Sequence, residues 1–131
     1  MYGQEIQVEA LDSLGIPSNP DFAYAVDLFN NGYYWESHVW WEELWHLAGR
    51  KGPIADLLKA LIKFAAAGVK MELGQKPPAI GHIERGLELI EALLNNSFQI
   101  DGVDLNELYT TLLLCRDEKI SLSEVKIDIK K

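Results

Sequence analysis

The segment from residue 33 to residue 48 constrains the fold most, because it holds all four tryptophans of the chain. At about 100° per residue of an α-helix, Tyr34, His38, Trp41 and Trp45 share one face, and Trp40 lies away from it. Four indoles spread round one helix exceed what a single apolar stripe can bury. We therefore expect neighbouring helices to cover most of the tryptophans, and one or two to be exposed or to line a pocket.

Proline, glycine and asparagine residues divide the chain into segments that repeat hydrophobic residues at the helical period. The expected helices are residues 20–30, 33–48, 53–73, 77–94 and 105–115. Their short connections predict an all-α, up-and-down bundle of four to five helices. We place this bundle domain at 21–116, after an N-terminal arm at 1–20. The C-terminal tail at 117–131 alternates loosely, as in a short strand or an extended arm laid on the bundle.

The segment 53–73 is predicted to be the central helix, because it is apolar on all but one stripe. That stripe carries Lys59, Lys63 and Lys70, which we interpret as a solvated face. The small residues at 65–68 leave room for a neighbouring element to come close. Gly86 in the next helix is expected to serve a similar close contact, since a glycine otherwise costs a helix about 1 kcal/mol.

The acidic balance of the chain restricts its partners. Twenty Asp and Glu residues against twelve Lys and Arg give a net charge of −8, which repels nucleic acid. A membrane span needs about 20 mostly uncharged residues, and charged side chains interrupt the most apolar run. We therefore expect neither nucleic acid nor a membrane as partner. The single cysteine, Cys115, is expected to be a buried apolar residue, and the first residues lack a signal-peptide pattern, so a cytoplasmic location is predicted.

The pair with the clearest chemical potential is His38 and Glu42, which lie one helical turn apart. The two side chains could form a hydrogen-bonded structural pair, an acid–base pair, or part of a metal site that His46 extends. Residues 43–46 match one Glu-x-x-His fragment of a di-iron bundle, but such a site needs two fragments. The sequence therefore assigns neither a metal nor a cofactor.

Three other polar side chains have less specific interpretations. Glu36 lies in the first turn of its helix, where the helix dipole favours a carboxylate. Lys63 is either solvated or turned inward to neutralise Glu42. His82 shares a face with Gly86 and is interpreted as structural.

The motif Phe29-Asn30-x-Gly32-x-Tyr34-Trp35-Glu36-x-His38, followed by Glu42 and Trp45, resembles the signature of the domain-of-unknown-function 309 family. A later helix with Leu61-Ile62-x-x-Ala65-Ala66-Ala67 and the Gly74 break is similar to that family's continuation, so the resemblance covers residues 21–94. It implies a small helical bundle with no established activity. It also implies a shared cluster at Tyr34, Glu36, His38, Glu42 and Trp45. Two positions depart from the family pattern: Val39 replaces a common Glu, and Lys63 replaces a frequent Gln.

Two functional hypotheses follow, beside the possibility of a purely structural accessory domain, which ranks between them. The favoured one is a helical interaction or small-ligand-binding module, with a protein partner or a second copy of the chain as further possibilities. Its candidate binding cluster is Tyr34, Glu36, His38, Glu42, Trp45 and Lys63. The alternative is a metal-assisted or acid–base hydrolase that uses His38 and Glu42. The chain has no nucleophile elbow, phosphate-binding glycine loop or cysteine pair, so no catalytic residue is assigned and an enzyme is the less favoured hypothesis.

Overall fold

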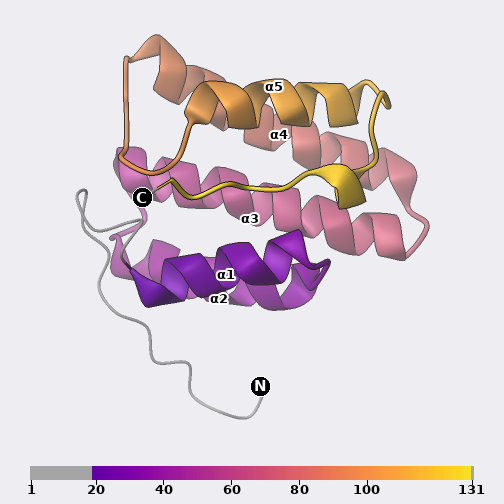
Figure 1. Cartoon of the computed structure of the whole chain (residues 1–131), viewed down its shortest axis with the longest axis horizontal. Helices are drawn as coiled ribbons and strands as arrows, with labels where there is room; N and C mark the ends of the chain where they lie inside the picture. Colours follow the sequence, from indigo (N-terminus) through magenta and orange to yellow (C-terminus); the bar gives the residue numbers. More distant parts are fainter. Residues whose placement is uncertain (1–18, 131) are drawn as a thin grey trace.

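A computed structural model describes residues 19–130, which form an all-α fold (Figure 1). The helices are α1 (Pro20–Asn30), α2 (Tyr34–Leu47), α3 (Pro53–Glu72), α4 (Lys76–Asn95) and α5 (Leu105–Arg116), followed by the short 3-10 helix η2 (Leu122–Glu124). Within this part of the chain no strand forms, and two isolated β-bridges are the only extended pairings. The predicted all-α fold is therefore confirmed. Of the predicted arm at 1–20, residues 1–18 lie outside the described residues.

Local capping signals explain why the helices begin and end where they do. The side chain of Asn19 accepts hydrogen bonds from the backbone N–H groups of Asp21 and Phe22, both at 2.9 Å, and Pro20 takes the first helical position. At the other end of the bundle, Gly74 follows α3 with a positive φ of 74°, which lets the chain turn into α4. These are short-range signals, so the predicted helices match the observed ones to within a residue or two.

Helix α3 is the central element, as expected. It makes its most extensive contacts with α4 and α2, while α1 packs on α2 and α5 packs on α4. Figure 1 shows α3 running between the α1–α2 pair and the α4–α5 pair. None of the helices in residues 19–130 is long and apolar enough to cross a membrane.

Two glycines permit the closest helix contacts. A Cβ atom added at Gly68 would lie 2.2 Å from Cγ of Tyr34, and one added at Gly86 would lie 2.3 Å from Cε1 of Phe64. Real Cβ atoms do not come that close to other heavy atoms, so both aromatic rings occupy space that only glycine leaves free. The close approaches expected at 65–68 and at Gly86 are therefore confirmed.

The C-terminal tail packs on the bundle as an extended arm. It crosses α3 between α5 and α1 (Figure 1), and it buries Leu122, Val125 and Ile127. The Asn30 amide anchors it, because Nδ2 donates to the carbonyl oxygen of Ile127 and Oδ1 accepts from the Ile127 N–H, each at 2.8 Å. The tail therefore completes the core that the five helices begin.

The tryptophans distribute as the sequence predicts. Trp41 is fully buried, and Trp40 and Trp45 are partly buried against the core. Trp35 is 50% exposed. Helix α2 thus contributes three indoles to the core and presents one at the surface.

Candidate functional site

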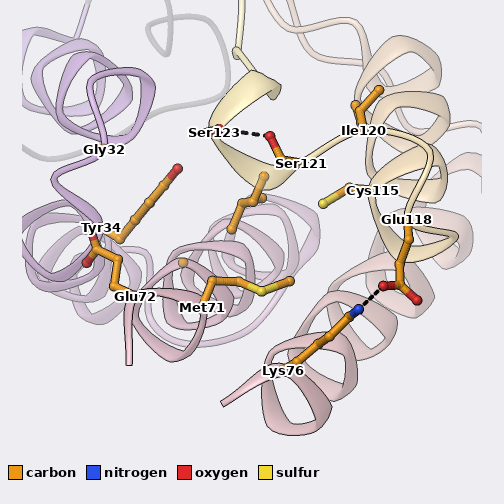
Figure 2. A pocket seen from close by; sticks show the side chains of 12 residues that line it. Gly32, Tyr34, Met71, Glu72, Lys76, Cys115, Glu118, Ile120, Ser121 and Ser123 are labelled. Carbon is orange, nitrogen blue, oxygen red and sulfur yellow. Dashed lines mark hydrogen bonds and ion pairs between the residues drawn. The ribbon is translucent and has the colours of Figure 1, made fainter. Parts of the chain in front are cut away.

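A cavity with mainly apolar walls lies on the side of α3 that the C-terminal tail covers. Its volume is about 540 Å³. The loop before α2, the start of α2, the end of α3, the start of α4, the end of α5 and the tail all contribute to its walls (Figure 2). The lining residues are Gly32, Tyr34, Gly68, Met71, Glu72, Lys76, Cys115, Glu118, Ile120, Ser121, Leu122 and Ser123. We call this cavity the Tyr34 pocket.

Tyr34 contributes a polar group to the wall of the pocket. Its ring packs edge-on against Phe29, with ring centroids 5.3 Å apart, and lies over Gly68. Figure 2 shows its hydroxyl pointing into the cavity, where it makes no hydrogen bond to any residue of 19–130. Burial raises the pKa of Tyr34, and the charge of Glu72 raises it further. The hydroxyl therefore stays protonated at neutral pH and can donate a hydrogen bond to a ligand.

Cys115 lines the same pocket from the end of α5. Burial raises the pKa of its thiol to about 11, with a smaller contribution from Glu124. A thiol of this kind stays protonated at neutral pH and is a poor nucleophile. The expectation of a buried apolar cysteine is confirmed, but the sequence did not indicate that it would line a cavity.

The mouth of the pocket is polar. Lys76 at the start of α4 forms an ion pair with Glu118 just after α5 (Figure 2). On the tail side, the hydroxyls of Ser121 and Ser123 lie 2.8 Å apart and bond to each other. The exposed Glu72 completes the rim. Apolar walls with a few polar groups at the rim are typical of small-molecule sites.

His38 does not belong to this pocket, although the sequence placed it in one cluster with Tyr34. Its ring stacks on Trp35, with centroids 5.5 Å apart and an interplanar angle of 5°. Its Nδ1 atom is buried and has no hydrogen-bond partner within the described residues. Burial lowers the pKa of His38, and the charge of Lys63 lowers it further while that of Glu42 raises it.

Lys63 approaches His38 without pairing to Glu42. Glu42 is exposed, and neither a His38–Glu42 hydrogen bond nor a Lys63–Glu42 ion pair forms in this structure of residues 19–130. Burial lowers the pKa of Lys63, and the neighbouring charges of Arg85 and Lys59 lower it further. The inward turn of Lys63 toward Glu42, which the sequence left open, is therefore not observed.

His82 on α4 lies near His38 and Lys63, close enough for both to lower its pKa. The Arg85 guanidinium donates to Nδ1 of His82 at 3.0 Å. Burial lowers the pKa of His82, as do the charges of Arg85, Lys63, Lys70 and His38 in that order. His82 therefore lies among basic side chains that three different helices supply, which its spacing along the sequence could not indicate.

Glu36 and Trp45 do not line the Tyr34 pocket, and Glu36 is not among the charges that shift the pKa of His38 or His82. Glu36 is partly buried in the first turn of α2, and its carboxylate makes no hydrogen bond or ion pair with another described residue. Trp45 packs on the core, with the Arg50 guanidinium 5.7 Å from its ring centroid and the His46 ring at 5.2 Å. Of the six residues in the predicted cluster, Glu42 and Lys63 lie near enough to His38 to affect its pKa, and Tyr34 lines a separate cavity.

The side chains that could bind a metal are dispersed. Within residues 19–130, no three His, Cys, Asp or Glu side chains come together in an arrangement that could hold a metal ion. Arg50 donates to Nδ1 of His46 at 2.8 Å, so the Glu-x-x-His fragment ends in a histidine engaged with an arginine. The geometry of this part of the chain therefore offers no metal centre.

The model of the family described as "Domain of unknown function (DUF309)" matches residues 22–81. This segment is a DUF309 domain. The resemblance drawn from the Tyr34–Trp45 motif is thereby confirmed, although it extended to residue 94 and the match ends at Gly81. No curated protein matches the chain.

The DUF309 domain supplies only part of the Tyr34 pocket. Tyr34, Gly68 and Met71 lie within it, whereas Cys115 and the tail residues 118–123 lie beyond the matched segment. The cavity therefore forms where the DUF309 domain meets the C-terminal part of the chain. The tail side of the pocket was missed from the sequence, because no local pattern indicates which distant helices an extended segment will face.

Proposed function

We propose that this protein binds a small, largely apolar molecule in the Tyr34 pocket. The observation that carries the proposal is the cavity of about 540 Å³ into which the Tyr34 hydroxyl points. Binding sites for small molecules typically measure roughly 300–1,000 Å³ and combine apolar walls with a few fixed polar groups. The Tyr34 pocket has both properties.

The lining indicates the chemistry of the ligand. Met71, Ile120 and Leu122 provide apolar walls, and the Tyr34 ring is held by Phe29 and Gly68. The Tyr34 hydroxyl is a protonated donor, so it would pair with an acceptor such as a carbonyl or ether oxygen. The fitting ligand is therefore a compact apolar molecule with one hydrogen-bond acceptor on its buried part.

The chemistry of the pocket favours binding over catalysis. Its lining contains no histidine, and the thiol of Cys115 is protonated at neutral pH. The alternative hydrolase would use His38 and Glu42, which lie outside the pocket and share no hydrogen bond. Acid–base catalysis needs a titrating group within reach of the bound substrate.

Titration with N-phenyl-1-naphthylamine, a neutral apolar dye that fluoresces in apolar surroundings, tests the proposal. We expect saturable binding of one dye per chain. Because Cys115 lines the pocket, bound dye should also slow the alkylation of Cys115 by iodoacetamide. The second readout separates binding in the pocket from adsorption elsewhere on the surface.

A pocket-filling variant sharpens this test. Ile120→Trp places an indole in the tail wall, so dye affinity should fall at least tenfold, whereas Ile80→Trp changes a partly buried isoleucine outside the lining and should bind as the wild type does. Thermal unfolding of both variants checks that each is folded. Dye binding that leaves Cys115 alkylation unchanged, or that survives in Ile120→Trp, would contradict the proposal.

Self-association is a second candidate, supported by the aromatic side chains at the start of α2. Tyr33 is 56% exposed and Trp35 is 50% exposed, one residue apart in sequence from the buried Tyr34. Exposed aromatic residues are enriched at protein interfaces. Native mass spectrometry of the wild type and Trp35→Ala tests it: a dimer that disappears in the variant supports it, and a monomer in both contradicts it.

A cytoplasmic location is proposed on the state of the single cysteine. Cys115 is a free buried thiol, which a reducing compartment preserves. Cell fractionation tests this directly, and recovery of the protein from an oxidising compartment would contradict it.

A further inference from the structure

We propose that the face formed by His38 of α2, Lys63 of α3 and His82 and Arg85 of α4 binds an oxyanion, namely the phosphate group of a small molecule. We call this surface the cationic face. None of its residues lines the Tyr34 pocket, so this proposal does not depend on the first.

Three packed helices bring the cationic face together. Central helix α3 contacts both α2 and α4, and its Lys63 ammonium lies near enough to His38 and to His82 to lower the pKa of each. On α4, the Arg85 guanidinium is held at 3.0 Å from the His82 ring. On α2, the His38 ring is held by its stack on Trp35. The two imidazole rings thus have defined neighbours, and the exposed Arg85 side chain lies at the surface of this face.

Within the described residues, no ion pair engages the cations of this face. Acidic side chains are nevertheless near, because Glu42 raises the pKa of His38 and Arg85 lines a separate cavity with Glu84, Glu88 and Glu91. The ion pairs of residues 19–130 join Lys76 to Glu118, Arg116 to Asp117 and Lys130 to Glu107, and none involves Lys63 or Arg85. Like charges gathered in this way repel one another, which a bound anion would relieve. A cationic cluster is also unexpected in a chain of net charge −8, where acidic residues outnumber basic ones.

The groups present suit a phosphate. A guanidinium offers a planar pair of N–H donors that match two phosphate oxygens, and an ammonium adds a point charge. His38 can gain a proton and add charge when an anion is near, whereas His82 can do so only by giving up the hydrogen bond that it accepts from Arg85. His38 also keeps a buried Nδ1 atom that has no partner among residues 19–130, so a phosphate could reach its ring only from the Nε2 side.

Binding of the anion should be coupled to protonation. The charged groups that face His38 are Glu42 on its own helix, Lys63 on α3 and His82 on α4. Those that face His82 are Arg85 on its own helix, Lys63 and Lys70 on α3, and His38 on α2. A bound phosphate favours the imidazolium form of His38, so it raises the pKa of that histidine, and by reciprocity its affinity increases as the pH falls toward the lowered pKa of His38 in the free protein. Protonation of His82 would instead remove the acceptor of its hydrogen bond from Arg85.

An NMR titration of the histidine ring signals with inorganic phosphate tests the proposal, at constant ionic strength maintained with sodium chloride. The chain has three histidines, and the third, His46, lies near the end of α2 as an internal reference. We expect saturable shifts of the His38 and His82 signals, with those of His46 unmoved. Lys63→Gln should weaken phosphate binding about tenfold, which corresponds to a loss of about 1.4 kcal/mol in binding free energy.

Lys51→Gln is the matched control, since Lys51 is exposed in the loop between α2 and α3. A parallel titration with glycerol phosphate distinguishes the source of the phosphate group: tighter binding than inorganic phosphate indicates a phosphorylated small molecule, and equal binding indicates the free ion. The proposal is overturned if the three histidines shift together, if no saturation is reached, or if Lys51→Gln weakens binding as much as Lys63→Gln.

Discussion

At the scale of single residues, the two glycines that lie under aromatic rings should respond to substitution in the opposite way from what helix propensity predicts. Replacing a helical glycine with alanine normally stabilises a helix by about 1 kcal/mol. At Gly86 the new Cβ would lie 2.3 Å from the Phe64 ring, in the middle of the α3–α4 contact. Overpacking of this kind typically costs about 1–3 kcal/mol. We therefore expect Gly86→Ala to lower the free energy of unfolding.

Gly81→Ala in the same helix is the matched control. A Cβ atom there would meet only the end of the flexible Arg85 side chain, at 3.4 Å, so the substitution should be neutral or stabilising. Urea unfolding of both variants, followed by circular dichroism, measures the difference. Equal midpoints for the two variants would show that the Phe64 ring can move aside and that Gly86 is not required for the contact.

At the scale of helices and loops, the sequence predicts features that depend on neighbouring residues and misses contacts between distant segments. The ends of α1 and α3 follow from Asn19, Pro20 and Gly74, because caps and turns act over a few residues. The spacing of His38 and Glu42 placed both on α2 but could not show that burial, rather than Glu42, dominates the pKa of His38. The Tyr34 pocket joins residues about eighty positions apart, and no periodicity within either segment indicates their meeting.

The anchoring of the tail yields a prediction at the same scale. The Asn30 side chain makes two hydrogen bonds with the backbone of Ile127, and net contributions of about 0.5–1.5 kcal/mol each are typical. We expect Asn30→Ala to lower the free energy of unfolding by about 1–3 kcal/mol. Hydrogen exchange of the Ile127 amide should accelerate, because its acceptor is lost.

Asn31→Ala separates this anchor from a general effect on α1. The Asn31 amide bonds only to the carbonyl oxygen of Asp27, at 2.8 Å on the exposed side of its own helix. Its removal should change stability by less than about 1 kcal/mol and leave the exchange of Ile127 unchanged. If both variants released the tail equally, the Asn30 hydrogen bonds would not be its anchor.

At the scale of the whole molecule, net charge conceals how the charges are arranged. The value of −8 predicts a surface that repels anions, and it was the reason for excluding nucleic acid as a partner. Folding nevertheless gathers Lys63, His82 and Arg85 on one side of the bundle, with His38 beside them. The stripe of lysines on α3 was visible in the sequence, but its cationic neighbours on α2 and α4 depend on how the helices pack. The net charge of the chain could not have shown such a face.

This arrangement predicts how the stability of the protein depends on pH. Burial lowers the pKa of His38 below its usual 6.5 in the folded state, and that of His82 is lowered as well. Below pH 6.5 the unfolded chain therefore binds more protons at these histidines than the folded one. Their contribution to stability is fully present above pH 6.5 and is lost as the pH falls toward the folded-state pKa values. His38→Gln removes one of the two contributions, so its urea midpoint should fall less than that of the wild type between neutral pH and about pH 5.

His46→Gln measures the effect of removing an exposed histidine at the other end of α2, and Lys63→Gln removes the cation whose charge lowers the pKa of both His38 and His82. Lys63→Gln should flatten the pH dependence in the same direction as His38→Gln, because both histidines are then protonated more easily in the folded state. The buffers must be free of phosphate, since an anion on the cationic face would have the same effect. A wild-type midpoint that does not fall below pH 6.5, or one that falls equally in His38→Gln, would mean that the folded chain accommodates the histidinium charge without cost.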